Sequence, residues 1–207
     1  GRVQIAEYAT QLSNDLNISL TLARDLSRVM EGVTPSTWEH RIADFQRMCQ
    51  LITHTEGYDY SEIVATFDYK LQNPAYPHAE GQYELIYPFS DTLHAARATL
   101  RDTSGFSTNI SYFERRNQNE EEMLEPYLLR RDSTGKVGYV VGVSVPVRDS
   151  LQRPVGVIAI NRSADYYRKK FAEYHPYNDM SLFLFSRDMK VIAGPTAELL
   201  GQDAEQI

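Results

Sequence analysis

The sequence lacks the features that identify most enzymes and metalloproteins. It contains no Walker loop, no G-x-G-x-x-G fingerprint and no G-x-S-x-G elbow, and none of its five histidines lies three to five residues from another. Its one cysteine, Cys49, lies within a helical pattern without an evident catalytic base, so we expect it in the core. We therefore expect no enzyme activity, no metal ion and no cofactor.

Basic residues and long apolar runs are also scarce. The chain has 21 Lys and Arg against 28 Asp and Glu, a formal net charge of −7. Binding to a nucleic-acid backbone depends on clustered basic side chains, so we expect no nucleic-acid partner. No run of 18 apolar residues and no signal peptide is visible. A single thiol forms no internal disulfide, which leaves the redox compartment undetermined.

Apolar and aromatic side chains are plentiful by contrast. Hydrophobic residues make up 42% of the 207 residues, with 14 Tyr and 8 Phe, which is enough for a core. The length suits one large domain, or one domain and part of another. Because the chain begins within a helical pattern and stops without closing an element, we expect a fragment whose flanking segments are missing.

Helical periodicity marks the N-terminal quarter of the chain. Apolar residues recur at 3.6-residue spacing over residues 3–31, and Gly32 follows as a stop signal. A second helix is predicted to reach about residue 54, with Ser36 as its N-cap and Glu39 completing a capping box. A long helix of this kind packs along a sheet or projects toward a partner.

Period-2 alternation follows and predicts strands. Residues 62–70 place Ile63, Ala65, Phe67 and Tyr69 on one face. Further strands are predicted over 82–89, 135–148 and 154–162, the last two as an antiparallel hairpin. Short helices over 91–100 and 163–174 and a hairpin of 181–185 with 191–193 complete the pattern. The order predicts an α+β fold, with a long N-terminal helix and an antiparallel sheet flanked by helices.

The stretch SYFERRNQNEEEMLEPY, residues 111–127, first suggests paired catalytic carboxylates. However, Glu120, Glu121 and Glu122 are adjacent, so on any regular element they point in different directions, and like charges in contact disfavour joint ionisation. We interpret them as a solvated acidic loop or helix end.

Three longer stretches carry a family resemblance: EPYLLRRDSTGKVGYVVGVSVPV, RPVGVIAINRSADYY and SLFLFSRDMKVIAGPTAELLGQDAEQI. In this order they resemble the double Cache (PAS-like) extracellular sensor domains of bacterial chemoreceptors and sensor kinases. The matching motifs are Tyr112-Phe113, Pro126-Tyr127, Val145-Pro146-Val147, Gly156-Val157-Ile158, Ala193-Gly194-Pro195 and Leu200-Gly201. The resemblance covers roughly residues 60–207.

The resemblance implies a domain organisation and a location. Residues 1–56 would form N-terminal helices, 57–178 a distal PAS-like sensor module, and 179–207 the opening hairpin of an incomplete membrane-proximal module. The domain would lie on the periplasmic or extracellular face of the cell membrane, attached through the missing flanking segments. A homodimer through the N-terminal helix is a further expectation.

The resemblance also implies a pocket for a small ligand. The residues expected to line it are Tyr112, Phe113, Arg115, Tyr127, Tyr139 and Asn161. In members that bind amino acids an Arg precedes the aromatic pair, where this chain has Asn109 or Ile110. Carboxylates of those members are replaced here by Leu129 and Asn161.

These departures bear on the ligand. A buried ammonium needs a carboxylate partner, because an unpaired buried charge costs several kcal/mol. We therefore expect a ligand other than a free amino acid. Four arginines suit an anionic ligand instead, namely Arg115, Arg116, Arg130 and Arg131.

Two functions remain open at this point. The first is an extracytoplasmic ligand-sensing domain of a chemoreceptor, sensor kinase or cyclase, in which a ligand shifts a population of states that the long helix transmits. The second is a dimerisation or partner-protein-binding module of such a receptor that binds no small ligand.

Overall fold

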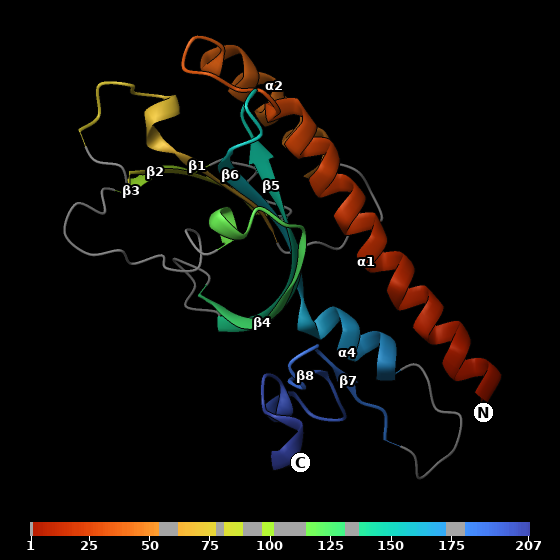
Figure 1. The fold of residues 1–207 in the computed structure, drawn as a ribbon. Helices are drawn as coiled ribbons and strands as arrows, with labels where there is room; N and C mark the ends of the chain where they lie inside the picture. The colour runs from red at the N-terminus through yellow and green to blue at the C-terminus, as the bar shows by residue number, and fades with distance from the viewer. Residues whose placement is uncertain are drawn as a thin grey trace. The chain divides into compact units, whose positions relative to one another are not determined.

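The computed structural model describes residues 2–53, 62–77, 81–88, 97–101, 115–130, 137–172 and 181–207 (Figure 1). The helices are α1 (Arg2–Met30), α2 (Trp38–Thr53) and α4 (Ala164–Ala172), with 3₁₀ turns η1 (Tyr69–Leu71), η2 (Ala197–Leu199) and η3 (Ala204–Gln206). The strands are β1 (Glu62–Asp68), β2 (Gln82–Pro88), β3 (Arg97–Arg101), β4 (Glu122–Arg130), β5 (Val137–Arg148), β6 (Pro154–Ser163), β7 (Leu184–Phe185) and β8 (Val191–Ala193). The predicted α+β class is confirmed.

Six strands form one sheet in the order β3-β2-β1-β6-β5-β4. Strand β2 pairs antiparallel with both β1 and β3, and its register places Glu84 opposite Thr66 and Gln82 opposite Asp68. Strands β7 and β8 form a separate antiparallel pair, which confirms the predicted C-terminal hairpin. The pairing of β1 with β2 therefore places side chains that are distant in the sequence directly opposite each other.

Helix α1 ends where the sequence predicts. Gly32 has a φ of +70°, the left-handed conformation that glycine adopts without steric cost, and its N–H donates to the Arg148 carbonyl at 2.8 Å. Helix α2 begins at Trp38, slightly later than predicted. The carbonyl of Thr37 accepts from the Arg41 N–H at 3.0 Å, so Thr37 and not Ser36 takes the cap position.

The contacts between Cα atoms divide the chain into two compact units. The terminal unit comprises Gly1–Ser19, Met123–Gly142 and Asn161–Ile207. The central unit comprises Leu20–Glu122 and Val143–Ile160. Each unit has a hydrophobic core of its own.

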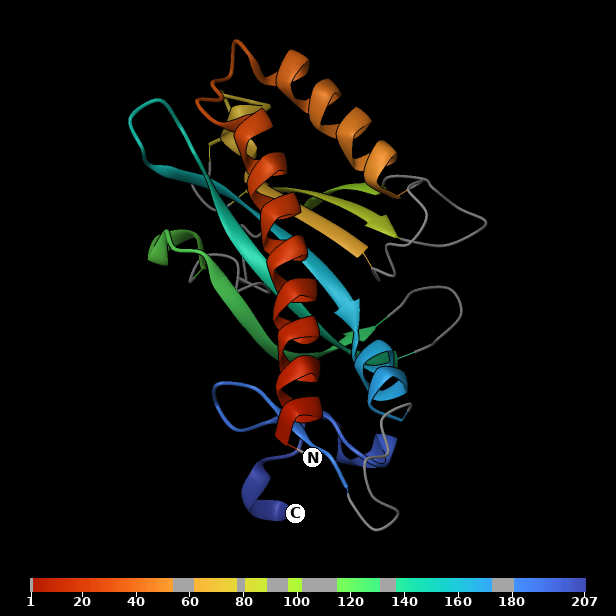
Figure 2. The same ribbon diagram turned by 90° about the vertical axis from the view of Figure 1, so that its right-hand side faces the viewer.

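In the central unit, the second half of α1 and all of α2 cover one face of the sheet (Figure 2). Rings of Trp38 and Phe45 meet Phe67 edge to face, with centroids 5.4 and 5.8 Å apart. Cys49 is fully buried in this cluster, as predicted. Because α1 and α2 present apolar stripes to this face, the opposite face of the same strands is left for other side chains.

The terminal unit has two smaller clusters. Leu12 of α1 packs with Val141, Tyr167 and Ile192. The second cluster joins Ala164, Val191 and Leu200 with partly buried aromatic side chains. The C-terminal hairpin is thereby packed within the terminal unit.

Two elements differ from the sequence-based prediction. Residues 97–101 form strand β3, where a helix over 91–100 was predicted; residues 91–96 lie outside the described range. The local composition favours a helix, but backbone pairing with β2 overrides it. Strand β4 was not predicted at all, because the residues before it read as a charged connector.

Candidate functional site

The central unit carries buried polar side chains on one face of its sheet. Ile63, Ala65 and Phe67 point into the core beneath α1 and α2, so the alternate residues of β1 point to the other side. The same alternation applies to β2 and β5. We call this surface the polar face; its buried polar residues are Glu62, Thr66, Gln82, Glu84 and Ser144, each at most 8% exposed.

Burial of so many polar groups on one sheet face is unusual, because each must exchange water for another partner. Glu84 lies opposite Thr66 in the β1–β2 register, a distance at which side chains interact across strands. Gln82 is 0% exposed, yet neither atom of its amide has a hydrogen-bond partner in the part of the chain that the structure describes. The polar face therefore contains a buried amide whose donor and acceptor are both unused among the described residues.

An ion pair lies at the end of this face. The Arg116 guanidinium donates to Asp68 at 2.6 Å, and both side chains are about one-fifth exposed. Arg116 and the half-buried Arg115 belong to a single helical turn over residues 115–118. Because Asp68 compensates the charge of Arg116, this arginine gives little support to the expected anionic ligand.

A hollow of about 220 Å³ lies beside the turns at Thr34 and Ser150 in the central unit and reaches Asp68 at the end of the polar face. Its lining includes Asp149 and Asp68, of which the first binds Arg153 at 2.8 Å and the second binds Arg116. These carboxylates already have cationic partners, so the hollow offers a weaker basis for recognition than the polar face.

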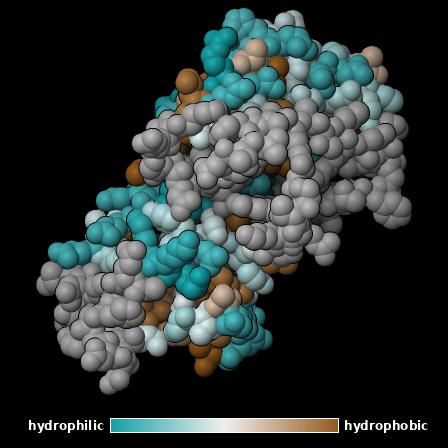
Figure 3. Space-filling model, turned by 180° about the vertical axis from the view of Figure 1, so that it is seen from behind, coloured by the Kyte–Doolittle hydropathy of each residue, from teal (hydrophilic) through white to brown (hydrophobic). Residues whose placement is uncertain are grey.

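The described part of the surface seen in Figure 3 is mainly hydrophilic, with separate small hydrophobic areas. Large hydrophobic side chains that are exposed come from different segments, for example Leu51, Met123 and Leu151. Scattered apolar side chains of this kind are ordinary on a protein surface. On this side, the described residues do not form a broad apolar docking patch.

The structure separates two of the residues predicted to line the pocket. Val141 packs against Leu12 of α1, so Tyr139, two residues earlier on β5, points to the same side of the sheet. Its ring packs in the C-terminal cluster so closely that a Cβ on Gly201 would lie 2.4 Å from it. Arg162 faces Asp15 of α1, so the neighbouring Asn161 points to the opposite side from Tyr139.

The other predicted pocket residues differ in burial and in the unit to which they belong. Asn161 is 0% exposed on β6, and Tyr127 is partly buried on β4. Arg115 belongs to the central unit, whereas Tyr127 and Asn161 belong to the terminal unit. Tyr112 and Phe113 lie outside the described residues.

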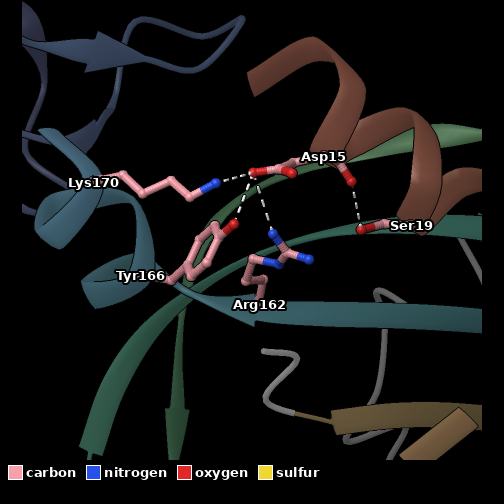
Figure 4. Close-up of polar contacts among 5 residues, drawn as sticks. All are labelled: Asp15, Ser19, Arg162, Tyr166 and Lys170. Carbon is pink, nitrogen blue, oxygen red and sulfur yellow. Dashed lines mark hydrogen bonds and ion pairs between the residues drawn. The ribbon is translucent and has the colours of Figure 1, made fainter. Parts of the chain in front are cut away.

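A second polar cluster lies in the terminal unit, around Asp15 (Figure 4). One carboxylate oxygen of Asp15 accepts from the Tyr166 hydroxyl at 2.8 Å and from the Lys170 ammonium at 3.0 Å. The Arg162 guanidinium, 6% exposed, lies 3.5 Å from the same oxygen and 4.2 Å above the centre of the Tyr166 ring. Ser19 donates to the Asp15 carbonyl at 3.1 Å, one turn along the helix. We call these residues the Asp15 cluster.

The Asp15 cluster affects the ionisation of its lysine. Burial acts to lower the pKa of Lys170, but hydrogen bonds with Tyr166 and Asp15 outweigh it, and the pKa is raised overall. Lys170 therefore stays charged and holds α4 to the first half of α1. The Asp15 cluster therefore stabilises the packing of α4 against α1 within the terminal unit.

The acidic stretch is more than a solvated connector. Glu121 is exposed, as predicted, but both its oxygens accept from the Arg24 guanidinium, with one N–O distance of 2.8 Å. The hydrogen bonds from Arg24 lower the pKa of Glu121. The pair holds the segment before β4 to helix α1 within the central unit.

Other chemistry finds little support among the described residues. No group of three or more His, Cys, Asp or Glu side chains there is arranged to hold a metal ion. Burial raises the pKa of the Cys49 thiol, which keeps it protonated and poorly nucleophilic. Within the same residues, no helix combines the length and apolarity needed to cross a membrane.

The polar face is not predicted by the sequence pattern. Glu62, Thr66, Gln82 and Glu84 alternate with apolar residues, a pattern that ordinarily indicates a solvent-exposed face. The one feature of the sequence that could have indicated the polar face is that these uncharged and acidic residues lie on two neighbouring predicted strands. Their burial depends on what covers the face, which alternation alone does not reveal.

Comparison with solved structures identifies proteins of the same fold. The periplasmic sensory domain of the Campylobacter jejuni chemoreceptor Tlp1 is 16% identical and superposes with a TM-score of 0.71, over 97% of this chain and 73% of that one. An extracellular domain attributed to a histidine kinase, mmHK1S-Z3, is 15% identical, with a TM-score of 0.69 over 97% and 72% of the two chains.

A third neighbour is described with its ligand. The ligand-binding domain of the Pseudomonas aeruginosa PAO1 amino acid chemoreceptor PctC, in complex with GABA, is 14% identical. Its TM-score is 0.60, over 100% of this chain and 78% of that one. Neither a family model nor a curated protein sequence matches the chain. The resemblance predicted from the sequence is thus confirmed for the fold: the chain folds like the extracytoplasmic sensor domains of chemoreceptors and histidine kinases.

Proposed function

We propose that the chain is the ligand-sensing domain of a transmembrane signalling receptor, located on the periplasmic or extracellular side. The observation that carries the proposal is the buried polar face of the central unit, in a fold shared with sensory domains. A structural sheet gains nothing from a buried amide without a partner, whereas a binding surface requires one. The small ligand binds against this face.

The polar face revises the expected ligand chemistry. Free amino acids are excluded as ligands only if the neutral Leu129 and Asn161 leave the pocket without a carboxylate, but Glu62 and Glu84 place buried carboxylates on the polar face. That exclusion therefore loses its basis. Arg116 is compensated by Asp68, which weakens the case for an anionic ligand. A neutral ligand fits the buried amide of this face better.

Calorimetry of the chain against amino acids, amines, carboxamides and carboxylates tests the proposal. Hydrogen exchange, measured with and without the best binder, should show added protection in β1 and β2 and none in the exposed 3₁₀ turns near the C-terminus. Protection confined to other segments would place the ligand elsewhere. If no small molecule binds while the chain dimerises or captures a partner protein, the alternative of a dimerisation or partner-binding module is correct.

The remaining assignments made from the sequence stay predictions. These are the division into residues 1–56, 57–178 and 179–207, the homodimer through α1, and ligand contacts by Tyr112, Phe113, Arg115, Tyr127 and Asn161. Single substitutions at these positions, measured by the same calorimetry, separate ligand contacts from bystanders. Tyr139 is the weakest candidate, because its ring already packs against the turn at Gly201.

A further inference from the structure

Gln82 is the most distinctive residue of the polar face. It begins β2, is 0% exposed, and both its amide oxygen and its amide nitrogen are without a hydrogen-bond partner among the residues the structure describes. More than nine-tenths of buried polar groups in proteins have a partner, and a buried group without one costs stability. An apolar side chain of the same length would fit this position at a lower cost.

The natural partner within the chain is already engaged. Asp68 lies directly opposite Gln82 in the β1–β2 register, at a separation where side chains interact. However, the Asp68 carboxylate is bound by Arg116 at 2.6 Å. Neither amide atom of Gln82 is bound by Asp68 or by another described residue, so the amide presents an N–H donor and a carbonyl acceptor side by side in one plane.

We propose that Gln82 recognises the carboxamide group of the ligand. The proposal rests on the proposed sensing function and names the ligand class for the same face. In the complex, the ligand N–H donates to Oε1 of Gln82, and the ligand carbonyl accepts from Nε2. The two planar amides thus form a pair of antiparallel hydrogen bonds, which satisfies both buried atoms at once.

The same geometry discriminates against a carboxylate. A carboxylate ligand accepts hydrogen bonds only, so one of its oxygens would face Oε1 of Gln82 without a proton between them. The amide and the acid of one carbon skeleton are therefore the informative pair of ligands.

The first test measures the free protein. Substitution Gln82→Met replaces the amide by an apolar chain of similar length, so the melting temperature without ligand should rise by about 3 °C. Gln72→Met, at an exposed position in the turn between η1 and β2, is the matched control and should leave the melting temperature unchanged. A lower melting temperature for Gln82→Met would mean that the amide has a partner in the free protein, which overturns the proposal.

The second test measures binding. Calorimetry compares nicotinamide with nicotinate and 4-aminobutanamide with 4-aminobutanoate. In the wild type and in Gln72→Met, the amide of at least one pair should bind at least about tenfold more tightly than the acid, and Gln82→Met should abolish that preference.

The outcomes separate this proposal from the sensing function. If the acids bind as well as the amides, or if Gln82→Met keeps the preference, the carboxamide assignment is wrong while the sensing function stands. If neither amide binds at millimolar concentration, the carboxamide assignment is also overturned. Binding of another molecule from the wider panel would still support the sensing function.

Discussion

Two buried polar regions of the molecule differ in whether the chain supplies their partners. In the Asp15 cluster, one carboxylate oxygen receives a tyrosine hydroxyl and an ammonium and lies 3.5 Å from a guanidinium. On the polar face, the amide of Gln82 receives nothing from the described residues. In the first region the chain supplies partners for the Asp15 carboxylate, whereas in the second region the donor and the acceptor of the Gln82 amide stay unused among the described residues.

This difference matters for the proposed sensing function. A carboxylate whose partners the chain supplies responds little to a small molecule, because a ligand would have to displace those partners. A region with an unused donor and acceptor gains a full set of hydrogen bonds on binding. The population of the bound arrangement then rises by the differential affinity for the ligand.

The largest loss of stability is expected for a substitution in the Asp15 cluster. Substitution Asp15→Ala removes the carboxylate that accepts from Tyr166 and Lys170 and that forms an ion pair with the 6%-exposed Arg162. We expect the free energy of unfolding to fall by about 3 kcal/mol, the lower end for breaking a buried ion pair. Urea unfolding measures the loss. Glu7→Ala, on the exposed surface of the same helix, should lower the free energy of unfolding far less. Equal losses would show that the charge on the helix and not the Asp15 cluster is responsible.

A second substitution tests the packing of Tyr139 within the terminal unit. Gly201 has a φ of +77°, and a Cβ there would lie 2.4 Å from the Tyr139 ring. Gly201→Ala should therefore destabilise the protein by about 2 kcal/mol, from backbone strain and displacement of the ring. Gly138→Ala is the control, since a Cβ at that strand position meets nothing within 4 Å. If both variants melt alike, the Tyr139 ring moves freely and becomes a better ligand contact than we infer.

A smaller effect is expected for the ion pair at the end of the polar face. A double-mutant cycle with Asp68→Asn and Arg116→Gln should give a coupling energy of about 1 kcal/mol, because both side chains are only one-fifth exposed. Thermal or urea unfolding of the four proteins provides the cycle. A coupling near zero would mean that Asp68 is available to Gln82, which would weaken the contrast between the two regions.

The smallest effect is expected for Glu121 and Arg24, an exposed pair. The pKa of Glu121 is lowered by hydrogen bonds from Arg24, so the pair stabilises the folded state above the unfolded-state pKa of about 4.3. This contribution declines as the pH falls through the folded-state pKa. Glu121→Gln should therefore melt slightly below the wild type at pH 7 and together with it at pH 2. A difference that persists at pH 2 would have another origin.

Local periodicity predicted most of the elements of this fold. Helix α1 with its stop at Gly32, strand β1, the long strands β5 and β6 and the C-terminal hairpin all follow from spacing and turn residues. Strand β3 did not follow, because pairing with β2 overrides a local helical preference. The predicted pocket residues were carried by motifs, and the structure separates Tyr139 from Asn161 because they point to opposite sides of the sheet.

The sequence by itself determined the α+β class, the burial of Cys49 and the similarity of the fold to extracytoplasmic sensor domains, because these depend on local pattern and motif order. Only the tertiary structure decided which polar residues are buried and which of them have partners. Asp15 and Tyr166 meet across 151 positions of sequence, and Gln82 meets the engaged Asp68 through strand register. Such contacts depend on how distant segments pack, so the polar face becomes visible only when the chain is folded.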